Sequence, residues 1–448
     1  MRYRTGGMAV SLLKDGSRII SEAKNEYEII KNLTHGGQGE IYLVRSGGKE
    51  HVLKVYFKDW ATPVQKTILM DLIAEDHPPS PFFVWPFDFI EFPDIPSFGF
   101  IMKHVDKKKY VELESKRFKE DGLNLYKDVN YALLLVDSFF KLHMRALCYA
   151  DISSSNIAFK NDGTSIKIFD TDNIVENGKQ GLVGGTLSFK APELITRKTI
   201  YPTIDTDRYS LALALFLLFF RNHPMNGKKH SRLPFVEADE MVDLYGVNPV
   251  FIFDPKNDEN RPDDPEAGEQ VMANTLWAAY PKYIRNLMIT SFTEGLKDPH
   301  RRIREITWRR ALIKLRDSIV KCPNCQMEVF YDPPEESSCM CWNCSHNIPA
   351  PPKMKITGPG INRLLMLDEG LDICRSHIDN LYDLRNKIGK IEKREACKIL
   401  GLTNLSSAPL KYQLNEGELK SIPPQRGICL RSNIKIHFSK EVTGMIVT

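Results

Sequence analysis

The sequence predicts an α+β fold in which a small β-rich lobe precedes a larger helical lobe, a cysteine-rich segment and a second β-rich region. Runs of β-branched and aromatic residues separated by glycine-rich turns come first, and long apolar runs typical of helices follow from about residue 125. Further on, five of the nine cysteines fall between residues 322 and 344. Strands and helices segregated along the chain are typical of the α+β class.

Length and composition set the outer limits of this prediction. The 448 residues, of which 42% are hydrophobic and 26% charged, predict a globular protein of several domains. A net charge of +4 without a dense Lys/Arg stretch argues against a nucleic-acid partner. The longest apolar run, residues 211–220, is too short to span a membrane. Because the first residues contain no signal-peptide core, we expect a cytoplasmic protein with reduced thiols.

Three strands are expected first, at residues 27–33, 40–45 and 51–57, with a hairpin turn at Ser46-Gly47-Gly48. The glycine-rich stretch His35-Gly36-Gly37-Gln38-Gly39 lies between the first two strands. Such a loop can bring backbone amides close to phosphate oxygens, but it can equally be a plain hairpin turn. A strand follows it instead of a helix, and no Gly-Lys-Ser/Thr ending is present, which argues against a Walker loop and a dinucleotide fingerprint.

Several polar residues stand where chemistry could take place. Lys54 lies inside the apolar third strand, Asp151 and Asn156 are five residues apart, and Asp170 ends a strand expected at residues 166–169. Taken singly, a lysine in a strand usually faces solvent, and Asp or Asn in a loop usually forms a turn or a cap. Their order along the chain makes a functional interpretation the better one.

This ordered set resembles the eukaryotic-like protein kinases over roughly residues 20–320. Three later segments extend the resemblance, namely residues 185–193 ending in Ala-Pro-Glu, residues 205–211 and residues 298–302. In that family the second of these begins the helix that anchors the catalytic loop, and the third supplies the arginine partner of the Ala-Pro-Glu carboxylate. The resemblance implies a bilobal domain over residues 1–320, with an N-lobe at about 20–105 and a C-lobe at about 106–320.

Matched position by position, the resemblance implies roles in phosphoryl transfer from ATP. Asp151 would accept the proton of the substrate hydroxyl, and Asn156 and Asp170 would coordinate Mg²⁺. Lys54 would hold the phosphates under the glycine loop, and the segment after residue 101 would contact adenine. The residues expected around ATP are therefore Gly36, Gly37, Gly39, Lys54, Met102 and His104.

The sequence also departs from the family pattern. Tyr149-Ala150 replaces the usual His-Arg before the catalytic aspartate, Ser153 replaces a lysine two residues after it, and Thr171-Asp172 replaces the usual Phe-Gly. The helix expected at residues 63–74 contains no glutamate to pair with Lys54, and Gln65 or Asp71 could face it instead. We interpret the chain as an active but divergent kinase.

On this interpretation, the chain is an ATP- and Mg²⁺-dependent protein kinase that phosphorylates Ser or Thr in a protein substrate. Residues 173–184 contain no Ser, Thr or Tyr, and Ala150 removes the arginine that would receive a phosphate, so phosphorylation of the activation loop should not be required. One alternative is a nucleotide-binding pseudokinase that acts as a scaffold through its C-terminal regions. Another is a small-molecule phosphotransferase of the same superfamily, which the intact Ala-Pro-Glu segment disfavours.

The cysteine-rich segment has the spacing of a metal site. Cys322 and Cys325 form one C-x-x-C pair, and Cys341 and Cys344 form a second after fifteen intervening residues. Two such turns can direct four thiolates at one Zn²⁺, so residues 321–347 are expected to form a structural zinc ribbon, against the alternative of an accidental cluster of free thiols. Cys339 and His346 could compete as ligands.

A Pro-rich linker is expected at residues 348–354, followed by a small β-rich domain at 355–448 with a helix-like stretch at 378–398. Short strands are expected at residues 364–367, 428–430 and 434–438. Together with residues 400–405 and 422–427, this arrangement resembles bacterial kinases of tellurite-resistance-type gene sets. That resemblance implies a von Willebrand A-type protein and a metal-dependent protein phosphatase as partners.

Overall fold

The computed structural model describes residues 11–75, 77–113, 115, 123–180, 185–233, 237–264, 268–332, 338–379, 386–394 and 399–447. The chain divides into two compact units, and each is described by itself. The first comprises Met1–Gly122, Leu134–Val271 and Leu287–Ile306, and the second comprises Leu123–Leu133, Met272–Asn286 and Thr307–Thr448.

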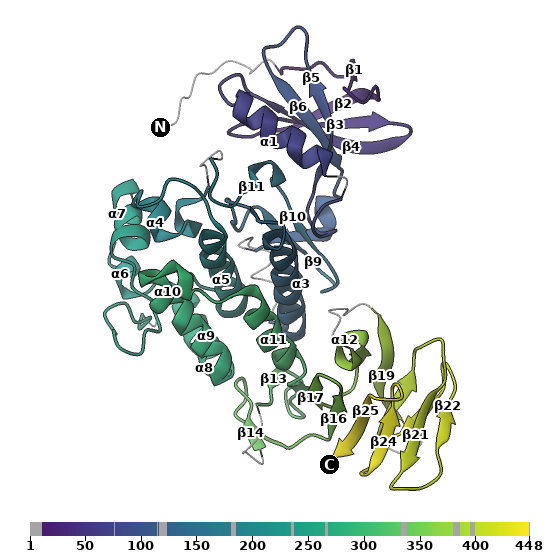
Figure 1. Cartoon of the computed structure of the whole chain (residues 1–448). Helices are drawn as coiled ribbons and strands as arrows, with labels where there is room; N and C mark the ends of the chain where they lie inside the picture. The colour runs from purple at the N-terminus through teal and green to yellow at the C-terminus, as the bar shows by residue number, and fades with distance from the viewer. Residues whose placement is uncertain are drawn as a thin grey trace. The chain divides into compact units, whose positions relative to one another are not determined.

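The N-terminal lobe of the first unit is a six-stranded antiparallel sheet with the strand order β1-β2-β3-β4-β6-β5, beside the helix α1 (Figure 1). These elements are β1 (Arg18–Ile20), β2 (Glu26–His35), β3 (Gly39–Ser46), β4 (Lys49–Tyr56), α1 (Pro63–Ala74), β5 (Pro86–Glu91) and β6 (Phe98–Lys103). The three strands predicted first are therefore confirmed. Gly47 and Gly48 form the predicted hairpin turn, with φ of 54° and 75°, a conformation that glycine adopts without strain.

Strand β4 has a different environment on each face because alternate residues of a strand point to opposite sides. Leu53 and Val55 are fully buried in an apolar cluster on one side. Tyr56 belongs to a second cluster on the other side, together with Leu69 of α1. Lys54, which alternates with Leu53 and Val55, is therefore directed to the side of the sheet that α1 covers.

The helical lobe of the first unit surrounds α5 (Ile204–Phe220), which is buried on every side from Leu211 to Phe220. At its start, the side chain of Thr203 accepts the backbone N–H of Thr206 and the Thr206 hydroxyl accepts that of Thr203, so the two orphan donors are satisfied. Within the described ranges, no helix combines the length and apolarity needed to cross a membrane. The apolar run is thus a core helix, as predicted.

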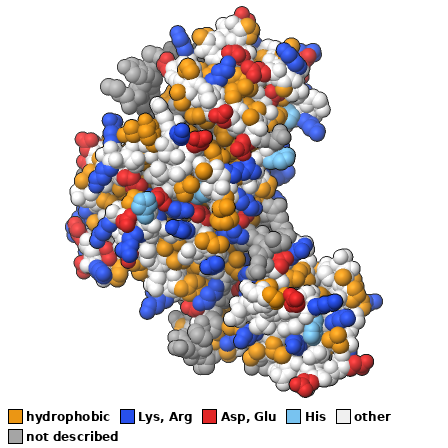
Figure 2. Space-filling view, in the orientation of Figure 1, with side chains coloured by type: hydrophobic (Ala, Val, Ile, Leu, Met, Phe, Trp, Pro, Cys, Tyr) orange, Lys and Arg blue, Asp and Glu red, His pale blue; other side chains and the backbone are white. Residues whose placement is uncertain are grey.

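The other elements between residues 107 and 316 are mostly short. They are η1 (Lys107–Lys109), β7 (Tyr110–Glu112), α3 (Leu125–His143), β8 (Leu147–Cys148), β9 (Ile157–Lys160), β10 (Ile166–Ile168), η2 (Thr171–Asn173), β11 (Val175–Glu176), η3 (Leu187–Phe189), α4 (Pro192–Ile195), α6 (Lys228–Ser231), α7 (Ala238–Val242), η4 (Asp243–Val247), α8 (Gly268–Ala279), α9 (Lys282–Phe292), α10 (Glu294–Lys297), η5 (Pro299–Arg301) and α11 (Glu305–Arg316). On the face drawn in Figure 2, acidic and basic side chains are interspersed, without an extended region of one sign.

In the second unit, two small hairpins precede a two-sheet β sandwich. The hairpins are β12 (Ile319–Lys321) with β13 (Glu328–Phe330), and β14 (Ser338–Met340) with β15 (Asn347–Pro349). The larger sheet has the order β17-β16-β25-β24-β21-β22, and the smaller has the order β18-β19-β20-β23. Their strands are β16 (Lys353–Gly358), β17 (Ile361–Met366), β18 (Asp372–Cys374), β19 (Lys387–Arg394), β20 (Ile399–Asn404), β21 (Leu410–Leu414), β22 (Lys420–Ile422), β23 (Gly427–Cys429), β24 (Ile434–His437) and β25 (Thr443–Val447).

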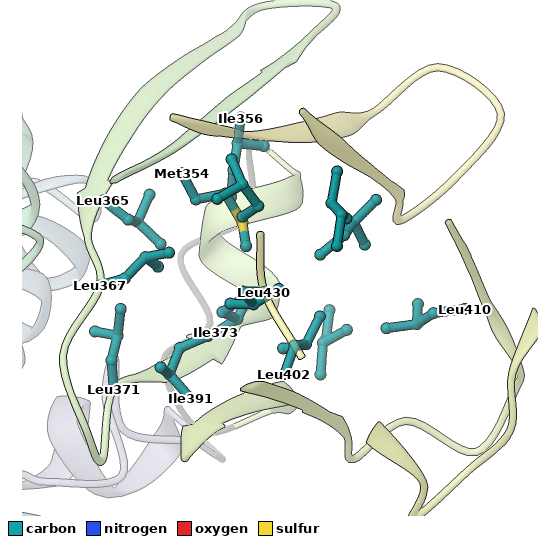
Figure 3. Packing of buried hydrophobic residues seen from close by; sticks show 14 of the residues in the cluster. Met354, Ile356, Leu365, Leu367, Leu371, Ile373, Ile391, Leu402, Leu410 and Leu430 are labelled. Carbon is teal, nitrogen blue, oxygen red and sulfur yellow. The ribbon is translucent and has the colours of Figure 1, made fainter. Parts of the chain in front are cut away.

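The sandwich encloses an apolar core built from both sheets. Figure 3 shows Met354 and Ile356 of β16 facing Ile373, Ile391 and other buried residues of the smaller sheet. Met354, Ile356, Ile373 and Ile391 are each 0% exposed. The predicted small β-rich region therefore has a hydrophobic core of its own.

The prediction of a helix at residues 378–398 is wrong. The structure has only the one-turn helix α12 (Arg375–Ile378) before a strand, β19, and residues 380–385 and 395–398 lie outside the described part of the chain. The pairing of β18 with β19 shifts register and skips Ile388, so this bulge turns Ile388 to the same buried side as Ile391. Two buried residues spaced three apart look like one face of a helix, which explains the error.

Candidate active site

The loop that contains Asp151 is hydrogen-bonded to the first turn of α5. Asp207, which is 2% exposed, accepts the backbone N–H groups of Tyr149 at 2.5 Å and Ala150 at 3.0 Å. Ala150 has a φ of 68°, an uncommon conformation for a residue with a side chain, and the two hydrogen bonds fix it. The predicted anchoring segment at residues 205–211 therefore supports this loop directly.

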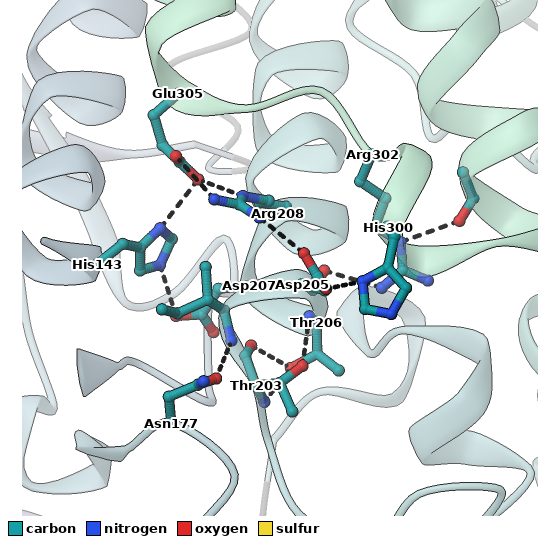
Figure 4. A network of polar contacts seen from close by, with 12 residues as sticks. His143, Asn177, Thr203, Asp205, Thr206, Asp207, Arg208, His300, Arg302 and Glu305 are labelled. Atoms are coloured by element: carbon teal, nitrogen blue, oxygen red, sulfur yellow. Dashed lines mark hydrogen bonds and ion pairs between the residues drawn. The ribbon is translucent and has the colours of Figure 1, made fainter. Parts of the chain in front are cut away.

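A polar network lies behind Asp207 (Figure 4). His143 Nε2 is 3.2 Å from Asp207 Oδ2, and its Nδ1 is 2.9 Å from Glu305 Oε1. Burial disfavours the charged imidazolium, but the hydrogen bonds and charges of Asp207 and Glu305 outweigh that effect and raise the pKa of His143. Despite its burial, Glu305 has its pKa lowered to about 2 by His143 and Arg208. The catalytic loop is thus supported both by hydrogen bonds to Asp207 and by the ion pairs of Asp207 and Glu305 with His143.

The two carboxylate oxygens of Asp151 have different surroundings. Asn156 Nδ2 donates to Asp151 Oδ2 at 3.0 Å, whereas the buried Oδ1 forms no hydrogen bond of normal geometry with the described residues. Burial, followed by the negative charge of Asp170, raises the pKa of Asp151 to about 6, whereas the Asn156 side chain, the Thr186 backbone N–H and the charge of Lys190 act in the opposite sense. A carboxylate whose pKa is close to neutrality is suited to accept a proton.

Asp170 follows β10 with a φ of 49°, a left-handed conformation that Asp tolerates better than most residues. Burial raises its pKa, and the charge of Lys54 opposes that rise. A carboxylate here and the amide oxygen of Asn156 form the kind of hard oxygen donor set that Mg²⁺ prefers, so the residues present fit that ion.

Lys54 has an ion-pair partner that the sequence analysis missed. Its Nζ lies 2.7 Å from Asp172 Oδ2, and the two side chains are 7% and 0% exposed. The Tyr56 hydroxyl also donates to Asp172 Oδ2, and Gln38 Oε1 accepts from Lys54 at 3.1 Å. Burial acts to lower the pKa of Lys54. The surrounding carboxylates, of which Asp172 has the largest effect, outweigh burial and raise the pKa, so the ammonium is charged.

Of the two α1 residues considered as partners for Lys54, Gln65 reaches the site and Asp71 is exposed. Gln65 Nε2 donates to the Tyr56 hydroxyl at 3.0 Å and to the Asp172 backbone oxygen at 2.9 Å. Helix α1 is thus attached to the site through Asp172 and not through Lys54. The signal available in the sequence was a carboxylate at the position where the family has glycine.

The three loop glycines differ in their surroundings. A Cβ on Gly39 would lie 2.0 Å from the Val55 backbone oxygen, so only glycine permits the close approach of β3 to β4. Gly37 has no atom within 4 Å of such a Cβ, and Gly36 has only the Gly39 backbone oxygen at 3.5 Å. Unlike Gly39, Gly36 and Gly37 would therefore accept a Cβ without a close contact among the described residues.

The segment after β6 contains the two residues predicted to contact adenine. Met102 is partly buried against the apolar cluster that includes Leu69 and Phe100. His104 Nδ1 lies 3.4 Å from Glu50 Oε2. Both therefore have protein contacts of their own, and their role toward a nucleotide stays a prediction.

At the end of the activation segment, Arg302 binds Glu193 in a two-pronged contact at 2.7 and 2.8 Å, with Arg302 almost completely buried. This is the carboxylate–arginine pair expected from residues 185–193 and 298–302. Residues 181–184 of the same segment lie outside the described part of the chain.

The second candidate site is the cysteine cluster. The Sγ atoms of Cys322, Cys325, Cys341 and Cys344 all lie within 4.8 Å of one another. Two of the sulfur–sulfur distances are 3.7 Å for Cys322–Cys344 and 3.6 Å for Cys325–Cys341. Tetrahedral Zn²⁺ with bonds of about 2.3 Å requires sulfurs roughly 3.8 Å apart, so this geometry fits zinc.

Matching backbone turns produce the cluster. Gln326 N donates to Cys322 O, and Ser345 N donates to Cys341 O, both at 2.9 Å. Gln326 and Ser345 have φ of 62° and 56°, so each C-x-x-C turn closes in the same left-handed conformation. Cys339 and His346, considered as competing ligands, are not members of this cluster among the described residues.

Comparisons with known proteins support the kinase resemblance. A model of the protein kinase domain matches residues 27–297, more than half of the chain. The chain is 29% identical over 122 residues to the proto-oncogene serine/threonine-protein kinase mos of Sus scrofa, covering 26% of this chain and 35% of that protein. It is 25% identical over 146 residues to the serine/threonine-protein kinase ppk6 of Schizosaccharomyces pombe, covering 31% and 18% respectively. The chain thus matches about a third or less of the length of these curated relatives.

Proposed function

Because the chain belongs to the protein kinase family, we propose that it is an ATP- and Mg²⁺-dependent kinase that phosphorylates Ser or Thr hydroxyls of proteins. The observation that favours activity most is the buried Asp151 carboxylate, which Asn156 holds through Oδ2 and whose pKa is raised to about 6 next to Asp170. The names of both similar proteins include serine/threonine-protein kinase, which supports the class of hydroxyl.

In the proposed reaction, Asp151 Oδ1 accepts the proton of the substrate hydroxyl as the oxygen attacks the γ-phosphorus. Lys54, kept charged by Asp172, binds phosphate oxygens, and Asn156 and Asp170 would hold Mg²⁺. The ion neutralises charge that develops on the phosphate oxygens when it is bound. Since the chemistry consists mainly of positioning and charge stabilisation, the buried carboxylates and the buried ammonium are the groups it needs.

The nucleotide would lie between the lobes of the first unit. The glycine loop, through Gly36, Gly37 and Gly39, would cover the phosphates, and Met102 and His104 would contact adenine. The glycine-rich sequence supports the first assignment, because glycine lets backbone amides approach phosphate oxygens closely. The second rests on the family resemblance.

We also propose a division into a kinase domain at residues 1–320, a zinc ribbon at 321–347 and a β domain at 355–448. The linker expected at 348–354 is shorter than predicted, because β15 extends to Pro349 and β16 begins at Lys353. The ribbon would bind one structural Zn²⁺ through Cys322, Cys325, Cys341 and Cys344. The sulfur spacing supports the metal, and the four protein thiolates leave no open coordination position of the kind that a catalytic zinc keeps.

The resemblance to bacterial kinases of tellurite-resistance-type gene sets suggests further context. It favours a cytoplasmic protein that acts with a von Willebrand A-type protein and a metal-dependent phosphatase. Binding of the purified chain to each candidate, with a partner of unrelated fold as control, would test this assignment.

The proposed activity is tested by transfer of label from γ-labelled ATP to a generic protein substrate. We expect transfer by the wild type and none by Asp151→Ala, with ATP binding retained by both. Wild-type protein that binds ATP without transferring label would favour the pseudokinase scaffold. Phosphatase-treated enzyme should keep its initial rate, because residues 173–184 offer no hydroxyl to phosphorylate.

A further inference from the structure

The catalytic loop has no cation of its own near Asp151. Residues 149–156 read Tyr-Ala-Asp-Ile-Ser-Ser-Ser-Asn, without lysine or arginine. Ser153, at the position where the family has lysine, is 1% exposed, and its hydroxyl faces that of Ser155 at 3.1 Å. A transferring phosphoryl group would therefore lack the positive charge that this loop usually supplies.

Lys190, from the end of the activation segment, approaches Asp151 instead. A Cβ built on Gly185 would lie 3.0 Å from Asp151 Oδ1 and 3.1 Å from Lys190 Cε, so both side chains border the same point. Gly185 has a φ of 101°, a conformation that favours glycine independently. The backbone here is thus shaped so that Lys190 and Asp151 can face each other.

The ammonium of Lys190 is available to bind an anionic group. Lys190 is half-buried, and burial lowers its pKa, while the charge of Asp151 acts against that effect. No described carboxylate lies within ion-pair distance of its Nζ, in contrast to Lys54 and its partner Asp172. A lysine whose side chain borders the same point as the base can reach a group that is bound beside Asp151.

We propose that Lys190 is a catalytic residue that binds the γ-phosphoryl oxygens in place of the lysine missing at position 153. The inference rests on the proposed kinase activity. The hydroxyl proton passes to Asp151 Oδ1, the hydroxyl oxygen bonds to the γ-phosphorus, and the bond to the β,γ-bridging oxygen breaks with its electron pair leaving on ADP. Lys190 stabilises the negative charge on the transferring group and takes no proton.

The test compares initial rates of label transfer for wild type, Lys190→Met, Lys190→Arg and Lys179→Met, at saturating ATP and several concentrations of protein substrate. Lys179 is a matched control because it lies in the same segment but is exposed and pairs with Glu176 at 3.7 Å. We expect Lys190→Met to lower kcat about 100-fold or more, the scale of losing one group that stabilises transition-state charge. Lys190→Arg should retain part of the rate, and Lys179→Met should match wild type.

Equilibrium ATP binding and thermal unfolding show whether each variant is folded, and ATP affinity should change less than about twofold in Lys190→Met. A wild-type kcat in Lys190→Met, or a change in KM alone, would overturn the assignment while leaving the kinase function intact. A defect that disappears at alkaline pH would also overturn it, because Lys190 would then act only on the ionisation of Asp151. Absence of transfer by the wild type would refute the proposed activity and this inference together.

Discussion

Lys54 and Asp172 form a buried ion pair in which Nζ and Oδ2 are 2.7 Å apart. Asp172 also accepts from Tyr56 through its side chain and from Gln65 through its backbone, so one residue connects the strand of Lys54 with helix α1. In the family pattern a glutamate of that helix pairs with the lysine directly. Here the carboxylate that pairs with Lys54 belongs to Asp172, and helix α1 is attached to Asp172 through the side-chain amide of Gln65.

This arrangement predicts that restoring a glutamate on α1 is harmful. Gln65→Glu would remove both N–H donors and direct a carboxylate at the Asp172 backbone oxygen, which is 2.9 Å away in the present structure. Leaving a buried polar group unsatisfied costs about 1–3 kcal/mol. We expect a lower thermal unfolding temperature and slower phosphoryl transfer.

Asp71→Asn is the control for Gln65→Glu, because Asp71 lies on the same helix but is exposed, and it should behave as wild type. A Gln65→Glu variant that is more stable or faster than wild type would show that α1 can supply the lysine partner after all.

The glycine at position 185 should be required for activity. Gly185→Ala places a methyl group 3.0 Å from Asp151 Oδ1 and forces a side chain into a φ of 101°. We expect a loss of about 100-fold in transfer rate, since displacement of a reacting group by about 1 Å has that effect.

Gly178→Ala is the control that separates the effect of contact with Asp151 from the effect of backbone strain. Gly178 also has a positive φ, 76°, but no atom lies within 4 Å of its Cβ position. This variant should lose stability without a comparable loss of rate. Equal rate losses in the two variants would mean that the approach of Gly185 to Asp151 is irrelevant.

The network beneath the catalytic loop predicts a pH-dependent contribution to stability. The raised pKa of His143 means that its stabilising effect is complete below the unfolded value of about 6.5 and declines as pH rises through the folded value. The lowered pKa of Glu305, about 2, has the opposite sense, so its contribution is present above about pH 4.5 and is lost toward pH 2. The network should therefore be strongest between about pH 5 and 6.5.

Thermal unfolding of wild type and His143→Gln at pH 6 and pH 9 measures this effect. The difference between the two proteins should be larger at pH 6. His300→Gln serves as the control, since His300 is 87% exposed, and it should show little difference at either pH. A His143→Gln penalty that grows with pH would contradict the assignment of a charged imidazolium.

How far the sequence predicts the structure depends on whether a feature is local. Lys54, Asp151 and Asp170 could be found because their order along the chain is itself the signal. The partner of Lys54 could not, because it depends on how the segment after β10 packs between β4 and α1. The bulge at Ile388 was missed for a related reason, since buried residues three apart occur both in helices and in bulged strands.

Metal analysis should find one zinc per chain. Cys322→Ser removes one of four sulfurs that lie within 4.8 Å of one another and should abolish stoichiometric zinc binding. Because structural zinc sites contribute folding energy, residues 321–347 should become susceptible to proteolysis. Cys339→Ser, in the same segment but outside the cluster, should keep its metal. Zinc-free wild-type protein with an intact, protease-resistant ribbon would refute the site.

The claim that Asp172 does for Lys54 what a helix glutamate does elsewhere is tested most directly by a double-mutant cycle on the transfer rate. The proteins are wild type, Lys54→Met, Asp172→Asn and the double variant, each checked for folding by thermal unfolding. If the pair acts as one unit, each single change should lower the rate by about 100-fold or more, and the double variant should be no slower than the slower single variant. Rate losses that multiply in the double variant, or an Asp172→Asn enzyme as fast as wild type, would contradict the account.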